Sequence, residues 1–338
     1  MKINHNVCLF KNVPFKKQEY YQYRIPGIVV TKKNTVLTYF EARTKFGDWA
    51  TIDIKLMRST DEGKTFSAPL CLVNGSKTKN TVNNPVMIVG NDNTIHFFYC
   101  VEYGVKSKGG GVFYSKSIDD GLTFSSPTDI SEVFLPLNAN VIAIGPGHGI
   151  CTKNNAIMCA VWFVPKEKSK SETCHFPSYV TTLYSLDNGK SFNVGETIKS
   201  DIKSLNESEL LELSDGKIMI NMRAPHEGCR AISLSDSGYD NWCEVYKDKA
   251  LTDPTCFAGI TKTQAGTIFF VNCCHNKKRR LLTLKKSIDD GKTFKREMLV
   301  FKGTAGYSDI ASDDKGNLYV AYEVKSGKSY YVAQISEK

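Results

Sequence analysis

Three arginines that lie far apart in the chain point most directly to binding chemistry. They are Arg24, Arg223 and Arg279, and each flanks an apolar run. Three guanidinium groups aimed at one point repel one another unless an anion lies between them, held by charge-assisted and partly bidentate hydrogen bonds. If the fold brings the three segments together, they predict a site for an anion.

Carboxyl groups and one phenol belong to the same part of the predicted fold. Glu41, Asp48 and Glu207 accompany the arginines, and Tyr307 carries the nearest hydroxyl group. A simpler explanation exists for some of these residues, because Arg24 could pair with Glu41 alone. The interpretation therefore depends on the elements that would bring the whole set together.

A repeated turn motif supplies the first of these elements. The pattern Ser-x-Asp-x-Gly-x-Thr-Phe begins at Ser59, Ser117, Ser185 and Ser287, and a degenerate copy begins at Ser233. Asp and Gly favour a tight turn, the hydroxyl groups can bond backbone amides, and the aromatic residue anchors the turn in the core. A motif that recurs roughly every 50 residues is typical of repeat architectures.

Six hairpin patterns alternate with these repeats. Each has an apolar run, a polar turn and a second apolar run, and the turns lie near Asn34, Asn93, Asn155, Gly216, Gly266 and Gly316. The first five hairpins are followed by a third strand, a repeat and a short fourth strand. The N-terminal segment 7–10 can supply the strand that the sixth unit lacks. The pattern predicts an all-β, six-bladed β-propeller over residues 1–338, as a single domain.

Strand order then separates two faces. In a four-stranded meander, the repeats and the turns between strands one and two lie at one end. The start of strand one, the end of strand two and the start of strand three lie at the other end, where functional groups are expected. That face collects Arg24, Glu41, Arg43, Asp48, Asn84, Glu102, Glu207, Arg223, Arg279 and Tyr307.

Composition narrows the environment and the partners. The net charge is +9, which favours an anionic partner. It does not distinguish a nucleic acid from an anionic surface or an anionic small substrate. The 11 cysteines include no CxxC pair, and Cys273-Cys274-His275 lacks zinc-ligand spacing, so no metal site and a reducing compartment are expected. The N-terminus lacks the apolar stretch of a signal peptide, and no apolar run could span a membrane. Cytoplasmic location is the resulting expectation.

One segment and the repeats carry a family resemblance. Tyr23-Arg24-Ile25-Pro26 resembles the F/Y-R-I-P motif of sialidases, and the repeats resemble their Asp boxes. The match runs from Arg24 to Tyr307 in the family's order. The chain is therefore similar to the small bacterial exo-sialidases of glycoside hydrolase family 33.

The resemblance implies a role for each matching residue. Arg24, Arg223 and Arg279 match the triad that holds the sialic acid carboxylate, where Arg279 is preferred to Arg280 because it lies eight residues before Ser287. The catalytic residues implied are Tyr307 as nucleophile, Glu207 as its partner carboxylate and Asp48 as acid and base.

Further positions concern the sugar around the reacting centre. Arg43 matches a residue near the sugar's O4, and Glu41 matches one that supports the triad. Asn84 and Glu102 complete the predicted substrate-binding set. Asn83 departs from the apolar residue that relatives often carry near the N-acetyl pocket.

The implied chemistry has a physical reason. The anomeric carbon of sialic acid carries a carboxylate, which would repel a carboxylate nucleophile; tyrosine nucleophiles in sialidases are a known exception. A neutral phenol avoids that repulsion, but with a pKa near 10 it needs a base, here Glu207. Asp48 would protonate the leaving oxygen and later activate water.

Several residues keep alternative interpretations. Arg223 could be an exposed charge at a strand end, Tyr307 a wall aromatic and Asp48 a turn residue. Asp53 competes with Asp48 as the acid, and Glu209 is expected on the same strand face as Glu207. His148 and His226 are expected to be structural or rim residues, and Trp49 and Trp162 are candidates for lining the cleft.

Two functional hypotheses follow. The first is a retaining exo-α-sialidase that cleaves terminal sialic acid from oligosaccharides, glycoproteins and glycolipids through a sialyl-tyrosine intermediate. It needs no cofactor, binds sialylated glycans rather than nucleic acid or membrane, and does not demand an oligomer, so a monomer is expected. The same site could instead perform trans-sialidase or intramolecular trans-sialidase chemistry. The second hypothesis is a non-catalytic sialic-acid-binding propeller, which the filled catalytic positions disfavour.

Overall fold

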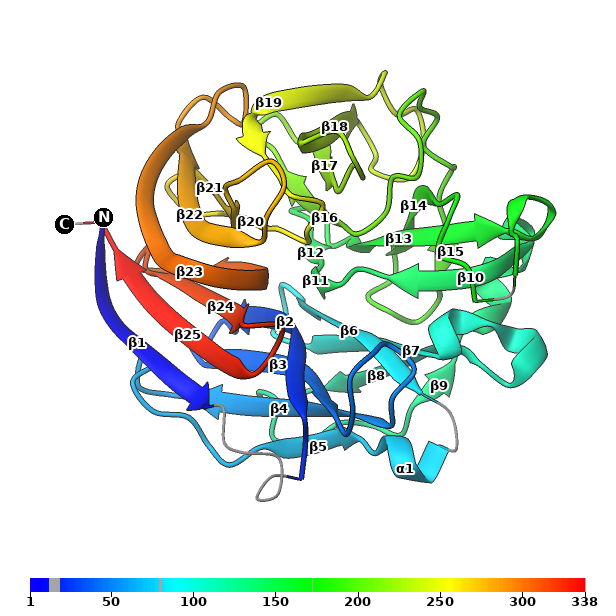
Figure 1. Cartoon of the computed structure of the whole chain (residues 1–338), viewed down its shortest axis with the longest axis horizontal. Coiled ribbons are helices and arrows are strands. Elements are labelled where there is room, and N and C mark those ends of the chain that lie inside the picture. Colours follow the sequence, from blue (N-terminus) through cyan, green and yellow to red (C-terminus); the bar gives the residue numbers. More distant parts are fainter. Residues whose placement is uncertain (12–18, 79–80, 172, 338) are drawn as a thin grey trace.

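The computed structural model describes residues 1–11, 19–78, 81–171 and 173–337, and its regular structure is almost entirely β. Five sheets lie around a common centre (Figure 1). Helical structure in the described residues is limited to the short helix α1 (Gly75–Thr78) and the 3-10 turns η2 (Glu102–Gly104), η3 (Lys106–Lys108), η4 (Ser131–Leu137) and η5 (Lys166–Lys168). None of the helices in these ranges is long and apolar enough to cross a membrane.

The first two sheets follow the order of the chain. One consists of β2 (Gln22–Val30), β3 (Val36–Arg43), β4 (Ile52–Ser59) and β5 (Leu70–Val73). The next consists of β6 (Val82–Val89), β7 (Ile95–Val101), β8 (Gly111–Ser117) and β9 (Thr128–Asp129), with β11 (Gly147–His148) paired in parallel with β6.

The third and fourth sheets are built in the same way. The third consists of β10 (Ala139–Ile144), β13 (Ile157–Pro165), β14 (Tyr179–Ser185) and β15 (Asn193–Val194), and β12 (Ile150–Cys151) also pairs with β13. The fourth consists of β16 (Ser208–Glu212), β17 (Ile218–Met222), β18 (Cys229–Ser235) and β19 (Tyr246–Thr252).

The fifth sheet has seven strands and joins both ends of the chain. Its order is β1 (Lys2–Phe10), β25 (Ser329–Ser336), β24 (Leu318–Val324), β23 (Lys295–Ser312), β22 (Arg280–Ser287), β21 (Ile268–Cys273) and β20 (Gly259–Lys262). The first part of β23 pairs with β22 and its last part pairs with β24. Two of the expected four-stranded units are thus fused, because the chain stays extended where a break between them was expected. The N-terminal segment pairs with β25, as expected from the sequence.

The hydrophobic core lies between neighbouring sheets. Leu37 and Tyr39 of β3 belong to the same cluster as Phe97 and Tyr99 of β7, and all four side chains are buried. The strands β3, β7 and β13 are buried along their whole length, because both faces of these strands are covered by packed side chains. All 11 cysteines are free thiols.

The repeated motifs are tight turns with a shared set of hydrogen bonds. In the first copy, the Ser59 hydroxyl accepts a hydrogen bond from the Gly63 amide at 2.9 Å and donates one to Asp61 at 2.7 Å. Asp61 accepts two more from Thr65, from its amide at 2.9 Å and its hydroxyl at 2.7 Å. The copies that begin at Ser117, Ser185 and Ser287 repeat this arrangement.

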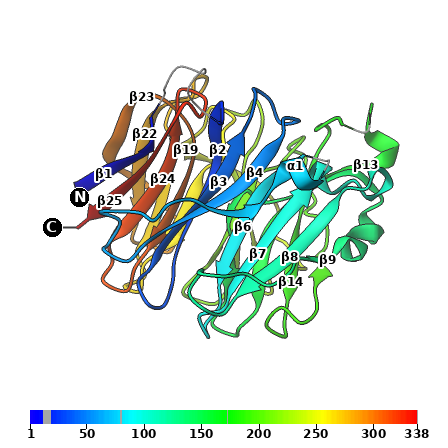
Figure 2. The ribbon, with the colours of Figure 1, turned by 90° about the horizontal axis from the view of Figure 1, so that it is seen from below.

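These turns share one face with the turns of the first hairpins. Asp120 of the second repeat accepts a hydrogen bond from Thr35, and Asp290 of the last repeat accepts one from the Ser214 amide at 2.8 Å. The strands run from this face to the opposite one, as the edge-on view shows (Figure 2). The opposite face therefore receives the first-strand starts and second-strand ends, where the candidate residues lie.

Candidate active site

A small polar cavity on that opposite face contains most of the predicted site residues. Its volume is about 200 Å³, and its lining is Arg24, Ile25, Asp48, Asn84, Tyr103, Trp162, His175, Glu207, Arg223, Arg279 and Tyr307. The three arginines therefore converge, as their positions in the predicted fold required. So do the three predicted catalytic residues and Asn84.

A hydrogen-bonded pair lies at the centre of the cavity. The phenol of Tyr307 donates a short hydrogen bond to Glu207 Oε1. Arg223 Nη1 donates to the other oxygen of Glu207 and also to the Tyr307 hydroxyl, the latter at 3.0 Å. A carboxylate in contact with a phenol in this way is placed to accept its proton.

Opposing electrostatic effects act on the pKa of Tyr307. Burial raises the pKa of Tyr307 and the charge of Glu207 raises it further, while Arg223, Arg279 and Arg24 act to lower it. The net shift is upward. The phenol is thus protonated in the resting protein, with its acceptor already in contact.

The other two arginines flank the phenol ring. The guanidinium carbons of Arg24 and Arg279 lie 5.1 Å and 5.4 Å from the centre of the Tyr307 ring. Arg279 also donates to the Thr255 carbonyl at 2.9 Å. The Nε of Arg223 is buried and has no hydrogen-bond partner among the described residues. A buried donor of this kind favours an acceptor supplied by a ligand.

The carboxylate that supports Arg24 is Glu323, and the expectation that Glu41 fills this role is wrong. Glu323 accepts two hydrogen bonds from Arg24, both at 3.0 Å, and is almost fully buried. Glu41 instead pairs with Arg43 at 2.6 Å and accepts the Asn84 amide at 2.8 Å. Glu41 and Arg43 are two residues apart on β3 and so share a face of the strand, which places them within reach of each other.

Asp48 lies at the cavity's edge with a partly exposed side chain. Arg43 Nη1 is 2.7 Å away and Arg24 Nη1 is 3.9 Å away. Burial acts to raise the pKa of Asp48, but the charge of Arg43 and its hydrogen bond, together with Arg24, outweigh burial, so the pKa is lowered. The backbone carbonyl of Asp48 accepts a hydrogen bond from Asn83 at 3.1 Å, which ties the loop to β6.

The competing acid, Asp53, lies elsewhere. Its carboxylate accepts hydrogen bonds from Tyr20 and from the Gly75 amide and pairs with Lys55 at 3.1 Å. It does not line the cavity. Glu102, predicted as a substrate-binding residue, is also absent from the lining.

Three aromatic side chains, which the sequence did not predict to lie together, form one wall of the cavity. The ring of Tyr103 lies 4.9 Å from that of His175 and 6.1 Å from that of Trp162. Trp49, predicted to line the cleft, lies 5.4 Å from Tyr103 and is 42% exposed. Trp162 is both nearly buried and part of the lining, so the two interpretations of that residue are compatible.

Beneath the cavity lies a buried group formed by His148, Glu209 and Asp309. His148 Nδ1 is 2.8 Å from Asp309 Oδ1 and 3.2 Å from Glu209 Oε1. The carboxylates also accept the amides of Ile28 at 2.8 Å and Ile260 at 2.7 Å. The three ligand-type side chains lie close enough to hold an ion, but their oxygens are already engaged by N–H donors.

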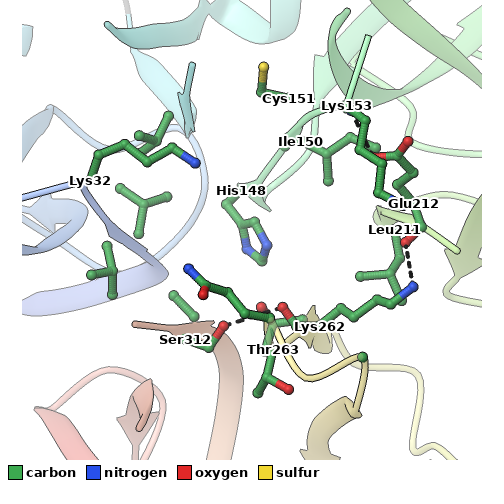
Figure 3. Close-up of a pocket in the computed structure, with 18 of the residues that line it drawn as sticks. Lys32, His148, Ile150, Cys151, Lys153, Leu211, Glu212, Lys262, Thr263 and Ser312 are labelled. Atoms are coloured by element: carbon green, nitrogen blue, oxygen red, sulfur yellow. Dashed lines mark hydrogen bonds between the residues drawn. The ribbon is translucent and has the colours of Figure 1, made fainter. Parts of the chain in front are cut away.

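A larger cavity opens on the face of the repeats. Its volume is about 520 Å³, and its lining includes Lys32, His148, Lys153, Leu211 and Lys262 (Figure 3). Lys262 is engaged there by the Glu212 carbonyl at 3.3 Å and by Asp290 at 3.2 Å. None of the predicted catalytic residues lines it, so size alone does not identify the site.

The chain is similar to known proteins over most of its length. A family profile described as "BNR repeat-like domain" matches residues 72–320. A sialidase of Bacteroides fragilis is 26% identical over 89% of this chain and 60% of its own length, and one of Micromonospora viridifaciens is 24% identical over 91% and 50%. The chain thus spans at most about 60% of these two relatives.

Solved structures resemble the fold. The Hadza microbial sialidase Hz136 superposes with a TM-score of 0.81 at 23% identity, over 94% of this chain and 66% of that one. The Trypanosoma rangeli sialidase in complex with sialic acid gives 0.74 at 17% identity, over 97% of this chain and 58% of that one. At these identities the likeness concerns the fold.

Proposed function

The chain belongs to the BNR repeat-like domain family, and from that premise we propose that it is a retaining exo-α-sialidase. Its substrates would be oligosaccharides, glycoproteins and glycolipids that end in sialic acid. The sialidase relatives support the reaction class. The observation that carries the proposal is the Tyr307–Glu207 hydrogen bond within reach of three guanidinium groups.

We also propose that the sheets form a six-bladed propeller in one domain, residues 1–338, with the repeats as Asp boxes. The seven-stranded sheet would supply two blades that share β23. The pairing of β1 with β25 would close the ring.

Substrate binding would be directed by its carboxylate. Arg24, Arg223 and Arg279 surround the Tyr307 ring and hydroxyl, so a carboxylate held by them would place its neighbouring anomeric carbon close to the phenol. Charge-assisted and bidentate hydrogen bonds give this contact both strength and orientation. The sugar's substituents would then face Asn84 and the aromatic wall.

In the first chemical step, the phenol oxygen of Tyr307 bonds to the anomeric carbon as the bond to the leaving oxygen breaks. The phenol proton passes to Glu207. Because the pKa of Tyr307 is raised, a free phenolate is not an intermediate, and proton transfer accompanies attack. Asp48 supplies the proton that the leaving oxygen requires.

In the second step water replaces the tyrosine. Asp48, now a carboxylate, takes a proton from water as its oxygen bonds to the anomeric carbon. The bond to Tyr307 breaks, and Glu207 returns the proton to the phenol oxygen. Two displacements at the same carbon retain the anomeric configuration.

Hydrolysis of a fluorogenic sialoside, with the products followed by NMR, tests the proposal. We expect release of the α-anomer of sialic acid first, and no turnover by Tyr307→Phe although that variant still binds sialic acid. Binding without release by the wild-type protein would identify a binding propeller instead. Adding lactose to the NMR assay separates hydrolysis from transfer, and an anhydro product would indicate the intramolecular reaction.

A further inference from the structure

The catalytic pair has a second pair of acidic residues directly behind it on the same two segments. Glu209 follows Glu207 by two residues at the start of β16, and Asp309 follows Tyr307 by two residues within β23. Tyr307 and Asp309 both lie in β23, and Glu207 immediately precedes β16, so each catalytic residue is two positions from a residue of the buried pair. The four side chains therefore form two successive layers, one catalytic and one fully buried.

The imidazole of His148 joins the two carboxylates of the buried layer. Its Nδ1 lies 2.8 Å from Asp309 and 3.2 Å from Glu209, and its backbone amide donates to Glu209 at 3.1 Å. Gly147 allows this approach, because a Cβ there would lie 2.1 Å from Glu209 Oε1. A buried carboxylate needs a charged or hydrogen-bonding partner, and the His148 imidazole, in contact with both carboxyl groups, links them.

We propose that His148 is a positioning residue for the proposed sialidase reaction, holding β16 against β23 so that Glu207 stays in contact with Tyr307. The inference rests on the proposed function. Without the imidazole, the buried Asp309 carboxylate loses its cationic partner and the link between the two strands is broken, so the strands move apart. That displacement lengthens the Glu207–Tyr307 hydrogen bond two residues away.

His148 is reachable from the other face of the molecule. Its side chain is 11% exposed and points into the cavity of about 520 Å³ on the face of the repeats (Figure 3). This cavity is separate from the catalytic one, because the two linings have no residue in common. A small ring can therefore enter the space left by truncating His148 without meeting the substrate.

Chemical rescue of His148→Ala by imidazole tests the proposal. We expect kcat on a methyl sialoside to fall roughly 100-fold, as a displacement of about 1 Å in a catalytic group can cause, with little change in KM. Added imidazole should raise the kcat of His148→Ala at least about tenfold. Pyrazole, a ring of the same size that is not protonated at neutral pH, should not. The wild-type protein with imidazole is the control.

The following outcomes decide whether His148 positions the catalytic pair. Unchanged kcat in His148→Ala overturns the proposal. Recovery of the unfolding temperature with imidazole, but not of kcat, also overturns it, because His148 would then only stabilise the fold. If His148→Ala does not fold, His148→Gln is measured in its place: a folded protein with lowered kcat and a KM near that of the wild type supports the proposal, and a folded protein with wild-type kcat or with a raised KM contradicts it. A wild-type protein that cleaves no sialoside fails the proposed function itself, a result distinct from a defect in the variant alone.

Discussion

Replacing Arg24 by methionine should destabilise the fold and weaken substrate binding, and a second substitution should separate these effects. In Arg24→Met, Glu323 keeps its charge at a site where its side chain is only 1% exposed. It also loses two hydrogen bonds of 3.0 Å. Removing one partner of a buried ion pair costs about 3–5 kcal/mol of the free energy of unfolding.

The double variant Arg24→Met/Glu323→Gln removes the stranded charge. Glutamine still offers an oxygen to the Tyr307 amide, which Glu323 accepts at 3.2 Å. Because replacing both charges of a buried pair is often nearly neutral, we expect most of the lost stability to return. Activity should not return, since the charge-assisted bonds to the substrate carboxylate, worth about 1.5–3 kcal/mol, are absent in both variants.

Urea unfolding and kcat/KM on a fluorogenic sialoside provide the two measurements. A loss of about 1.5–3 kcal/mol corresponds to roughly 10- to 150-fold in kcat/KM. Lys315→Met is the matched control, because Lys315 pairs with Glu62 at the exposed surface, where ion pairs contribute little to stability. If the double variant regains activity together with stability, Arg24 acts through the fold and not on the substrate. If it stays as unstable as Arg24→Met, the stability argument from charge compensation is wrong.

Three further predictions follow from the geometry. A substrate anion bound at Arg24 should offset the part of that arginine in lowering the pKa of Asp48. The alkaline limb of the pH profile of kcat should therefore lie at higher pH than the alkaline limb of kcat/KM. Alkaline limbs at the same pH, or limbs that persist in Asp48→Asn, would contradict this. Burial, followed by the charge of Asp309, raises the pKa of Glu209 to about 8 from 4.5, and Asp309 and Glu209 outweigh burial to raise the pKa of His148. Both groups bind more protons folded than unfolded. The contribution of Glu209 is fully present below pH 4.5 and is lost as pH rises to about 8, and that of His148 is present below its usual pKa and lost above it. The free energy of unfolding should therefore fall between about pH 5 and 8, and less steeply in His148→Gln. Ser59→Ala leaves the Gly63 amide without its acceptor, so we expect about 1–2 kcal/mol less stability in urea and unchanged kcat, whereas a fall in kcat would argue against the separation of the two faces.

Much of the candidate site was predictable because strand order decides which residues share a face. The repeats mark the turns of one end, so the segments around Arg24, Glu207 and Tyr307 had to emerge at the other. Their meeting in one cavity follows from that alternation. The fusion of two units through β23 was not predicted, because no local pattern shows that an extended segment continues from one sheet unit into the next.

The partner of Arg24 could not be predicted from pairing within a hairpin. Arg24 and Glu41 are opposite each other in the register of β2 and β3, which made Glu41 the natural candidate. The side chain instead reaches Glu323 on β24, 299 residues away in sequence. Glu323 gives one sequence signal, a single carboxylate within the apolar run 318–324. Such a signal predicts burial with a partner but cannot name the partner, which depends on packing between sheets.

The positive charges around Tyr307 connect binding, nucleophile and acid in one electrostatic arrangement. The same arginines that would hold the substrate carboxylate limit the rise in the pKa of Tyr307, and Arg24 also contributes to lowering the pKa of Asp48. In the free protein Arg43, together with Arg24, lowers the pKa of Asp48, and Arg223 donates hydrogen bonds to both Glu207 and the phenol. A bound carboxylate reduces their effect on Asp48, which favours a protonated acid only when substrate is present. In the proposed reaction, anion binding and acid catalysis would therefore share one residue, Arg24, which is paired with the buried Glu323.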